Sequence, residues 1–572
     1  MHIQMGLYQM IVGIDLGTTH SLIGCYGESG PELFRNALGD YLTPSVVSVN
    51  DDGHIIVGEA ARDRLVSHPQ RSVASFKRWM GTARETRLGD RGFRPEELSA
   101  LVLRSLLADA EAALGEKVQE AVISVPAYFS DAQRKATRAA GELAGIRIER
   151  LINEPTAAAL AYGLQEKREN TRFLVFDLGG GTFDVSILEM FDGIVEVHAS
   201  AGDNYLGGED FLDLLQNICL SDLKLAADRF SSHELGSLRR RLEMAKRELS
   251  QQPEVKIDCQ IDGVPIAWQI DQDRFQQMAD PLMQRMRAPL ERALRDARLQ
   301  PDQLNEIILV GGASRMPLVS RLVARMFGRL PLRHVNPDQA IALGASVAAG
   351  LKSRNAKLDE IILTDVCPYT LGVETGQRNA QGNVQSGLFS PVIQRNSIVP
   401  ISREHTYAPM VEHQAKLMLN VYQGENPLVA NNIKLGQLEI PLNPTLPISQ
   451  NQIVVRFTYD INGVLQVEAM PVGSKIRYEL LLEQNPGTLQ EPEIRARLAA
   501  LSELKIHPRS KQENIALLAR AERLFEEYLA ARPMLQQWIV QFRQSLESQD
   551  EQIIREHQRN FTLALDQMEA QL

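Results

Sequence analysis

The stretch Arg172-Phe-Leu-Val-Phe-Asp-Leu-Gly-Gly-Gly-Thr-Phe-Asp-Val-Ser-Ile-Leu188 predicts a buried strand, a glycine turn and a returning strand. The three glycines (179–181) have no Cβ, so successive backbone N–H groups can converge there on a phosphate. Asp177 and Asp184 flank the turn, and carboxylates with water are the usual ligands of Mg2+. A tight hairpin that binds nothing is the alternative interpretation of this single motif.

The same pattern occurs near the N-terminus, in Met10-Ile-Val-Gly-Ile-Asp-Leu-Gly-Thr-Thr-His-Ser-Leu-Ile-Gly24. Asp15 ends the first strand, and Gly17 and the hydroxyls of Thr18 and Thr19 follow it. Two copies of one unit at a domain-sized separation predict two related lobes that face each other across a cleft. Such a cleft would hold the phosphates of a nucleotide between the turns, whereas two unrelated hairpins are the alternative.

The composition is that of a soluble globular protein with several domains. The chain has 572 residues, of which 44% are hydrophobic and 23% charged, and a net charge of −11. This charge argues against nucleic acid as the main partner, and we also expect no membrane association. The start lacks the pattern of a signal peptide, and Met1, Met5 and Met10 are all candidate starts. The four cysteines lie far apart, which predicts reduced thiols in a cytoplasmic protein.

Strands and helices alternate up to about residue 350, which predicts an α/β region. Lys77 is a lone lysine in an apolar context, for which a solvated surface position is the ordinary interpretation. Residues 239–250 predict a helix with Glu243 and Lys246 on one face, typical of a salt-bridged surface. Strands dominate after about residue 366, and the region from residue 491 onward predicts helices with their own apolar core.

In this order, the pieces resemble the DnaK-type heat-shock chaperones over nearly the whole chain, and most of all the short HscC subgroup. The resemblance is carried by Gly13-Ile-Asp-Leu-Gly-Thr-Thr19, Val125-Pro-Ala-Tyr-Phe129, Asn153-Glu-Pro-Thr-Ala-Ala158, Phe176-Asp-Leu-Gly-Gly-Gly-Thr-Phe-Asp184, Leu206-Gly-Gly-Glu-Asp-Phe211, Val310-Gly-Gly-Ala-Ser-Arg315 and Val335-Asn-Pro-Asp338.

The resemblance implies a multidomain fold. It comprises an actin-like (ribonuclease H-like) two-lobed α/β ATPase domain (10–356), a linker (357–366), a β-sandwich substrate-binding domain (367–484) and an α-helical lid (485–572). The function that it implies is that of an ATP-dependent chaperone. ATP binding and slow hydrolysis would switch the sandwich between low and high affinity for extended apolar peptide segments of unfolded or specific client proteins.

Motif by motif, the resemblance also implies roles for individual residues. Catalytic roles fall on Lys77, Glu154, Asp184, Thr182, Asp15 and Asp177, of which Asp15 and Asp177 would hold Mg2+ through water. Binding of ATP or ADP falls on Gly17, Thr18, Thr19, Gly179, Gly180, Gly181, Gly207, Gly208, Glu243, Lys246, Arg247, Ser250, Gly311, Gly312, Arg315 and Asp338. K+ is a further candidate ion at this site.

The remaining implied positions concern peptide and partner proteins. The expected peptide pocket comprises Val373, Tyr407, Met410, Leu417, Leu419 and Val464, for which filling the sandwich core is the alternative. The relay between nucleotide and linker, and the docking of a J-domain co-chaperone, fall on Pro126, Arg134, Arg150 and Asp365. The stretch 250–271 is shorter than in general-purpose members, so we expect weak or no dependence on a GrpE-type exchange factor.

Two departures from the family pattern stand out. Thr364 places a hydroxyl in a linker that is otherwise apolar, and His20 follows the two threonines, where we interpret it as a solvated neighbour. Three other classes of protein share part of this pattern: a small-molecule kinase with the same phosphate turns, a filament-forming actin-like protein, and a peptide-binding protein without hydrolysis. The first two would lack the region after the linker, and the third would lack the catalytic residues.

Overall fold

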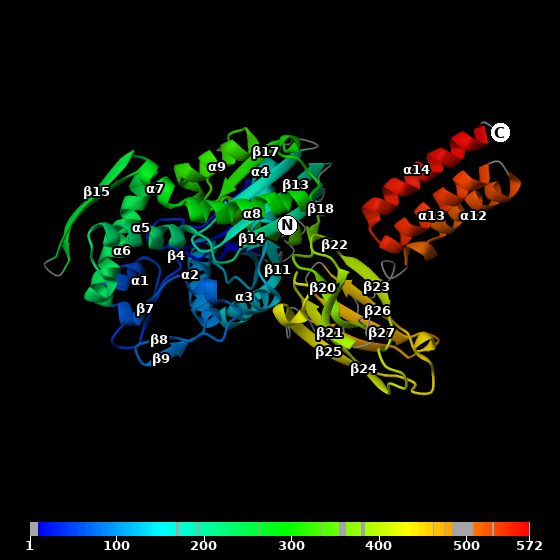
Figure 1. Ribbon diagram of the computed structural model, residues 1–572. Coiled ribbons are helices and arrows are strands. Elements are labelled where there is room, and N and C mark those ends of the chain that lie inside the picture. Colours follow the sequence, from blue (N-terminus) through cyan, green and yellow to red (C-terminus); the bar gives the residue numbers. More distant parts are fainter. Residues whose placement is uncertain are drawn as a thin grey trace, which may run out of the picture. The chain divides into compact units, whose positions relative to one another are not determined.

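The computed structural model (Figure 1) divides into two compact units, one of residues up to Pro368 and one of residues from Tyr369. The structure describes residues 10–166, 171–191, 194–261, 264–332, 335–353, 362–378, 384–460, 463–474, 476–482, 507–528 and 531–570. The architecture is mixed α/β with many sheets, as predicted. Among the helices of these ranges, none combines the length and apolar character needed to span a bilayer.

The first sheet of the first unit contains the N-terminal hairpin. Its central strand β1 runs antiparallel to β2 and parallel to β10, in the order β11-β10-β1-β2-β3. Its strands are β1 (Ile11–Asp15), β2 (His20–Gly27), β3 (Gly30–Leu33), β4 (Thr43–Pro44), β10 (Glu120–Val125) and β11 (Arg147–Asn153). Every residue of β1 is buried, as expected of a central strand covered on both faces.

The second sheet repeats this arrangement with the strands of the second hairpin. Strand β12 runs antiparallel to β13 and parallel to β17, in the order β17-β12-β13-β14-β18. Its strands are β12 (Thr171–Leu178), β13 (Phe183–Phe191), β14 (Ile194–Asp203), β17 (Glu306–Val310) and β18 (Ile362–Leu363). Both hairpins are therefore present as predicted, each at the centre of its own sheet.

Helices cover the two sheets and connect their strands. They are α1 (Glu59–Ser67), α2 (Pro95–Leu114), α3 (Asp131–Ala144), α4 (Glu154–Glu166), α5 (Gly208–Asp222), α6 (Ser232–Leu249), α7 (Gln272–Met278), α8 (Asp280–Asp296), α9 (Pro317–Phe327) and α10 (Ala340–Lys352). Helix α10 packs on β1 and on α4 so closely that a Cβ at Gly344 would lie 1.7 Å from the carbonyl oxygen of Ala157. Because α4 also packs on β12 and β13, these two helices join the sheets.

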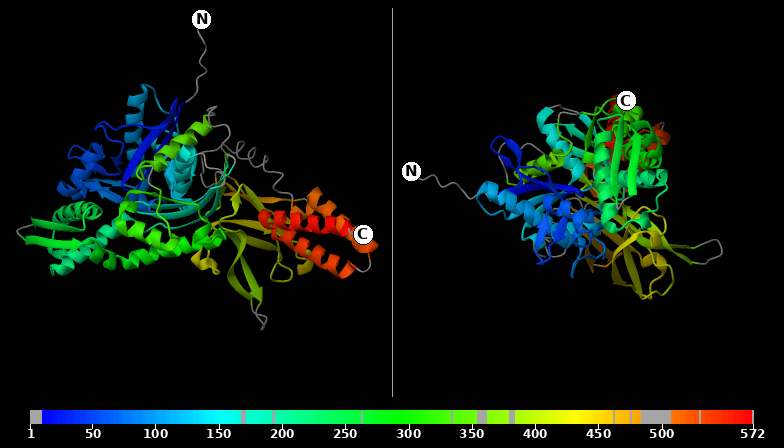
Figure 2. Two further views of the ribbon diagram at one scale, coloured as in Figure 1. Left: turned by 90° about the horizontal axis from the view of Figure 1, so that it is seen from above. Right: turned by 90° about the vertical axis from the view of Figure 1, so that its left-hand side faces the viewer.

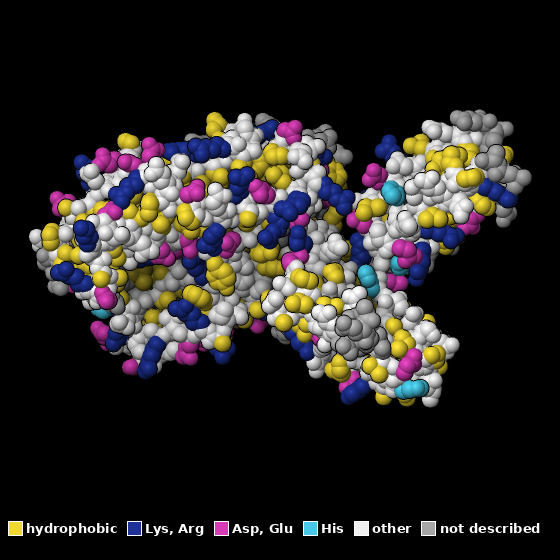
Figure 3. Space-filling model, in the orientation of Figure 1, with side chains coloured by type: hydrophobic (Ala, Val, Ile, Leu, Met, Phe, Trp, Pro, Cys, Tyr) yellow, Lys and Arg dark blue, Asp and Glu magenta, His cyan; other side chains and the backbone are white. Residues whose placement is uncertain are grey.

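Short strands form three peripheral sheets of the first unit. They are β5 (Val47–Val49) with β6 (Ile55–Val57) and β7 (Ser72–Val73), β8 (Thr86–Leu88) with β9 (Arg91–Phe93), and β15 (Glu254–Ile261) with β16 (Val264–Asp271). The β15–β16 hairpin extends from the edge of the unit beside α6 and α7 (Figures 1 and 2). On the face drawn in Figure 3, cationic and acidic side chains are interspersed over this unit.

The second unit contains two four-stranded antiparallel sheets, ordered β21-β20-β24-β25 and β23-β26-β27-β28. Their strands are β20 (Leu371–Arg378), β21 (Val384–Ile393), β23 (Ile401–Tyr407), β24 (Lys416–Gln423), β25 (Ile433–Pro441), β26 (Ile453–Tyr459), β27 (Leu465–Pro471) and β28 (Tyr478–Leu482). Buried Leu419 of one sheet and Val455 of the other alternate with more exposed neighbours.

The C-terminal helices of the same unit are α12 (Gln512–Glu527), α13 (Arg532–Ser548) and α14 (Glu551–Ala570). Leu524, Phe542 and Phe561, one from each helix, belong to a common apolar cluster. The Phe542 and Phe561 rings pack with their centroids 5.0 Å apart. The predicted apolar stripes therefore form the core of a small bundle, and Pro533 lies in the first turn of α13, where its missing N–H costs no hydrogen bond.

Candidate functional site

The two glycine turns meet at the centre of the first unit. A Cβ at Gly180 would lie 2.2 Å from Cγ2 of Thr19, and one at Gly181 would lie 2.7 Å from Cγ2 of Thr18. The two predicted phosphate turns therefore touch each other. Glycine at these positions leaves the backbone open where a larger residue would fill the space.

The first turn is braced by serine hydroxyls. The Gly17 N–H donates to Oγ of Ser21 (3.2 Å), and Oγ of Ser45 donates to the Gly17 carbonyl (2.8 Å). The backbone N–H of Ser45 also donates to the carbonyl of Thr19 (2.8 Å). At the end of β1, Asp15 accepts a hydrogen bond from Oγ of Ser124 (2.8 Å). The carbonyls of Gly17 and Thr19 and the carboxylate of Asp15 are thus each held by a neighbour.

The second turn is fastened to the start of α5. The backbone N–H groups of Gly208 and Glu209 donate to the carbonyls of Gly179 and Gly180, each at 2.9 Å. A Cβ at Gly207 would lie 2.5 Å from the carbonyl carbon of Gly180, so this contact also requires glycine. The motif around Gly207 and Gly208 therefore holds the backbone of the second turn in place.

Four buried carboxyl groups surround one buried lysine between the turns. Lys77 donates to Oε1 of Glu154 at 2.9 Å, with side chains 4% and 7% exposed, and its Nζ lies 5.5 Å from the centroid of the Phe129 ring. The ordinary interpretation of Lys77 as a solvated residue is therefore wrong. Asp177 and Asp184 are directly paired across β12 and β13, and Asp184 accepts a hydrogen bond from the Tyr128 N–H (3.0 Å).

The three aspartates of this cluster have raised pKa values, because burial and neighbouring negative charges disfavour their ionised forms. Burial and then the charge of Glu154 raise the pKa of Asp15 and that of Asp184, each to about 7. The pKa of Asp177 is raised well above its ordinary value, first by burial and then by the surrounding carboxylates. Within the described ranges, Oδ2 of Asp177 and Oδ2 of Asp184 are buried without a hydrogen-bond partner.

This donor set fits a hydrated divalent cation. Buried oxygens without partners and carboxylates with raised pKa values both indicate that a positive charge is missing from the cluster. No group of three His, Cys, Asp or Glu side chains in the described ranges is arranged to ligate a metal directly. An ion such as Mg2+, which keeps several of its waters, suits such a site.

The residues on α6 and near β17 that were predicted to bind ATP or ADP gather beside the turns. Glu243 forms ion pairs with Lys246 (2.6 Å) and Arg247 (2.9 Å), as expected of a salt-bridged helix. Lys246 also donates to the Gly208 carbonyl (2.9 Å), so the same helix face contacts the site. Helix α6 begins at Ser232, earlier than predicted, because Ser231 and Glu234 form a capping box.

The other side of this region is formed by the turn after β17. Gly311 adopts φ = 79°, and Arg315 of η5 (Gly312–Arg315) forms an ion pair with Asp338 at 2.6 Å. Lys246 and Ser250 line a small pocket with Phe275 and Met316.

His20 also belongs to this region. Burial and the charges of Arg247 and Arg62 lower the pKa of His20 to about 4. Its side chain is partly buried, so the interpretation of a solvated neighbour is wrong. Proximity in sequence to the threonines did not reveal that α6 and α1 enclose this side chain.

Comparison with known proteins assigns the chain to a family. The model of the Hsp70 protein family matches residues 11–572. The chain belongs to the Hsp70 family. A relative named chaperone protein DnaK, from Thermotoga neapolitana, is 40% identical over 532 residues, which cover 90% of this chain and 87% of the relative. The chaperone protein dnaK3 of Thermosynechococcus vestitus is 40% identical over 581 residues (94% and 83%).

Because the chain belongs to this family, the protein is an ATP-dependent molecular chaperone and an ATPase. The Thermosipho africanus protein, likewise named chaperone protein DnaK, is 38% identical over 528 residues and covers 90% of this chain. The Hsp70 family binds ATP and ADP.

A chain of polar contacts in this Hsp70 protein leads from the site to the linker. Arg134 donates to the carbonyls of Phe129 (3.3 Å) and Ala127 (3.2 Å) and to Oδ1 of Asn153 (2.7 Å). Asn153 in turn donates to both carboxylate oxygens of Asp365, each at 2.8 Å. Asn153 was not predicted as a site residue, although it lies in a quoted motif directly before Glu154.

The other relay positions lie close to this chain. The Pro126 carbonyl accepts a hydrogen bond from the Phe129 N–H (3.1 Å). Burial lowers the pKa of Arg150 and raises that of Asp365, and each charge partly opposes the shift of the other. All four predicted relay residues are therefore near one another.

The described part of the linker extends the second sheet. Strand β18 pairs in parallel with β14, and the Thr364 N–H donates to the Val195 carbonyl at 3.0 Å. The Thr364 hydroxyl donates to the same carbonyl at 3.4 Å, so it has an acceptor. Residues 357–361 of the predicted linker lie outside the described ranges.

The residues predicted for the peptide pocket fall into two groups. Val373, Leu419 and Val464 are 0%, 3% and 3% exposed and lie in the interior of the second unit. Tyr407, Met410 and Leu417 are partly exposed, and the Tyr407 hydroxyl is hydrogen-bonded to Ser390 (3.1 Å). The side chains of the second group are therefore more accessible than those of the first.

Proposed function

We propose that this Hsp70 chaperone hydrolyses ATP at the cluster around Lys77 and uses the hydrolysis to change the affinity of its second unit for extended apolar peptides. The observation that carries the proposal is the buried Lys77–Glu154 pair, placed among three buried aspartates where two glycine turns meet. A buried charge cluster with raised pKa values in such a place is characteristic of a catalytic site.

The chain's own residues supply positioning and charge for phosphoryl transfer to water. The N–H groups of the two turns would bind the phosphates, and Lys77 would neutralise the charge that develops on the transferred phosphoryl group. Oδ2 of Asp184 is available to accept a hydrogen bond from the attacking water. Mg2+ held through water by Asp15 and Asp177 would neutralise phosphate charge when bound.

The coupling to the second unit would run through the linker. Two connections link the nucleotide site to the segment before Pro368. The first is the second sheet, whose edge strand is β18. The second is the chain of hydrogen bonds from Arg134 through Asn153 to Asp365. Because a ligand shifts an equilibrium only by its difference in affinity for two states, nucleotide and peptide must each prefer one arrangement.

The finer assignments remain part of this proposal. They are the actin-like ATPase (10–356), the linker (357–366), the sandwich (367–484), the lid (485–572), the peptide pocket and the HscC-like subgroup. A cytoplasmic location, K+ at the site and a J-domain partner are likewise predictions. Adding a GrpE-type factor should leave ADP release unchanged, and a large acceleration would contradict the expected independence.

Single-turnover ATP hydrolysis tests the proposal directly, with and without a panel of extended apolar peptides. The wild type should be stimulated by some peptides, and Lys77→Ala should lower hydrolysis about 10²- to 10³-fold, the usual loss when one stabilising group is removed. Lys256→Ala is the matched control, because Lys256 is an exposed lysine on β15, with a side chain 70% exposed. Equal rates for Lys77→Ala and the control would refute the catalytic assignment.

A further inference from the structure

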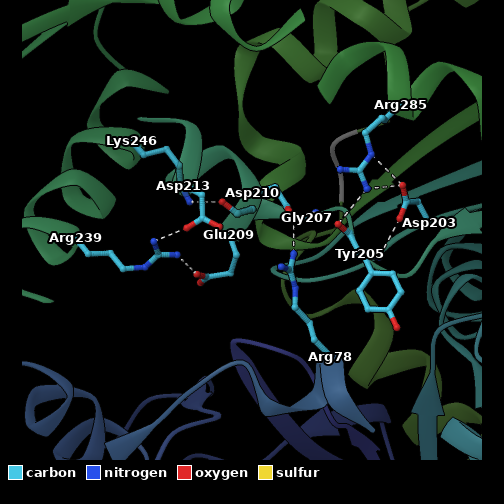
Figure 4. Close-up of polar contacts among 11 residues, drawn as sticks. Arg78, Asp203, Tyr205, Gly207, Glu209, Asp210, Asp213, Arg239, Lys246 and Arg285 are labelled. Carbon is cyan, nitrogen blue, oxygen red and sulfur yellow. Dashed lines mark hydrogen bonds and ion pairs between the residues drawn. The ribbon is translucent and has the colours of Figure 1, made fainter. Parts of the chain in front are cut away.

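Arg78 follows the catalytic lysine directly but extends to a different partner. Both residues belong to η2 (Phe76–Trp79), a short helix held by Phe76 in the core of the first sheet. Arg78 forms an ion pair with Asp210 in the first turn of α5, and the two side chains are 15% and 20% exposed. Figure 4 shows Arg78 reaching this group from the N-terminal part of the chain.

The Arg78–Asp210 pair joins the two halves of the nucleotide site. Phe211, the neighbour of Asp210, is buried in the core of the second sheet, whereas η2 belongs to the first. Asp210 is fixed in place because its Oδ2 also accepts a hydrogen bond from the Gly207 N–H (2.7 Å). The guanidinium is therefore held at the point where Gly207 supports the second glycine turn.

Arg78 also lies directly on that turn. A Cβ at Gly181 would lie 2.7 Å from Nε of Arg78, so the guanidinium occupies the space that the glycine leaves open. In the described ranges, Nε of Arg78 is buried and has no hydrogen-bond partner. A buried N–H without an acceptor is costly, and a guanidinium N–H is well suited to a phosphate oxygen.

We propose that Arg78 is a further nucleotide-binding residue, whose Nε–H donates to a phosphate oxygen while Asp210 positions the guanidinium through its other side. The inference rests on the proposed nucleotide site and deepens it, because it adds a phosphate ligand that spans both sheets. The proposed hydrogen bond would form with ADP and ATP, which have phosphates, but not with adenosine, which has none.

Calorimetric titration of the full chain with ADP and with adenosine tests the proposal. Arg78→Gln should lower the affinity for ADP about tenfold, the size expected for one hydrogen bond to a charged group, and should change the affinity for adenosine less than about twofold. Arg78→Lys retains the charge but not the forked donor, so it should lose about fivefold for ADP.

Arg239→Gln is the matched control. Arg239 forms ion pairs with Glu209 (2.6 Å) and Asp213 (2.5 Å) of the same helix α5, but it comes from α6 (Figure 4). We expect wild-type affinity for both ligands in this variant. Asp210→Asn, which weakens only the positioning, should lose less ADP affinity than Arg78→Gln and should also spare adenosine.

Three results would overturn the inference. They are wild-type ADP affinity in Arg78→Gln, an equal loss for ADP and adenosine, or, if Arg78→Gln does not fold, wild-type ADP affinity in Arg78→Lys. A wild-type protein that binds no ADP would instead refute the nucleotide site itself, and the inference with it. The two failures are therefore distinguishable.

Discussion

The two glycine hairpins share a sequence pattern and a place in their sheets, but they differ in how their carboxylates are satisfied. In the first, Asp15 is hydrogen-bonded to Ser124, and Ser21 and Ser45 brace the turn. In the second, Asp177 and Asp184 each keep an oxygen without a partner in the described ranges. The comparison shows that one repeated motif can leave its carboxylate hydrogen-bonded in one copy and partly without a partner in the other.

The largest expected effect comes from neutralising one carboxylate of each hairpin. Asp177→Asn should lower single-turnover ATP hydrolysis by about 10²- to 10³-fold, because its free oxygen is available to the ion and its water. Asp15→Asn should lose less, since one oxygen of Asp15 already accepts from Ser124. Equal losses in the two variants would show that the hairpins contribute alike.

Replacing one glycine of each turn by alanine should destabilise the protein in the first turn but not in the second. A Cβ at Gly17 would lie 2.0 Å from the backbone oxygen of His20, whereas one at Gly179 has no neighbour nearer than 3.7 Å. Gly17→Ala should destabilise the protein by about 1–3 kcal/mol, as overpacking does. Gly179→Ala should stay within about 0.5 kcal/mol of the wild type in urea unfolding followed by circular dichroism. The reverse order would contradict the comparison.

Removing a buried hydroxyl that is hydrogen-bonded to each hairpin should have a smaller effect. Ser45 shares a hydrogen bond with Ser21 (2.9 Å), and Ser200 shares one with Ser186 (2.7 Å). Ser45→Ala and Ser200→Ala should each cost about 1 kcal/mol of stability. Only Ser45→Ala should also weaken ADP binding, by a few-fold, because Ser45 additionally donates to the Gly17 carbonyl. Calorimetry with ADP on both variants checks this difference.

The smallest effect at neutral pH is expected at His20, which follows the first turn. Arg247 and Arg62 disfavour its protonation, Asp338 and Glu243 favour it, and burial keeps its pKa near 4 instead of 6.5. Above pH 6.5 the folded and unfolded states are both neutral at this residue. Between about pH 6.5 and 4 only the unfolded state takes up the proton, so stability is lost as the pH falls through this window.

His20→Gln should therefore unfold at nearly the wild-type urea midpoint at pH 7 and be less sensitive to acid between pH 6.5 and pH 4. Unfolding midpoints measured at several pH values provide the check. An unchanged acid sensitivity would mean that His20 is solvated after all.

Much of the fold could be predicted because its signals are local. Both hairpins follow from their apolar strands and their glycine turns. The ATP site could be located because its glycines and acids occur in motifs that resemble a known family. The early start of α6 was not predicted, because Ser231 and Glu234, which form its capping box, lie before the charged residues (243–247) that indicated the helix.

Local pattern was thus sufficient for the repeated hairpin and for the alternation of strands and helices, whereas the residues proposed to bind the phosphates were named from the family resemblance. Tertiary structure decided which of these residues are buried, paired or left without a partner. Lys77 and Arg78 are neighbours in sequence, yet one faces Glu154 and the other Asp210, which approach from different parts of the chain. Burial and long-range charge set these partnerships, because both depend on distances between segments that are far apart in sequence.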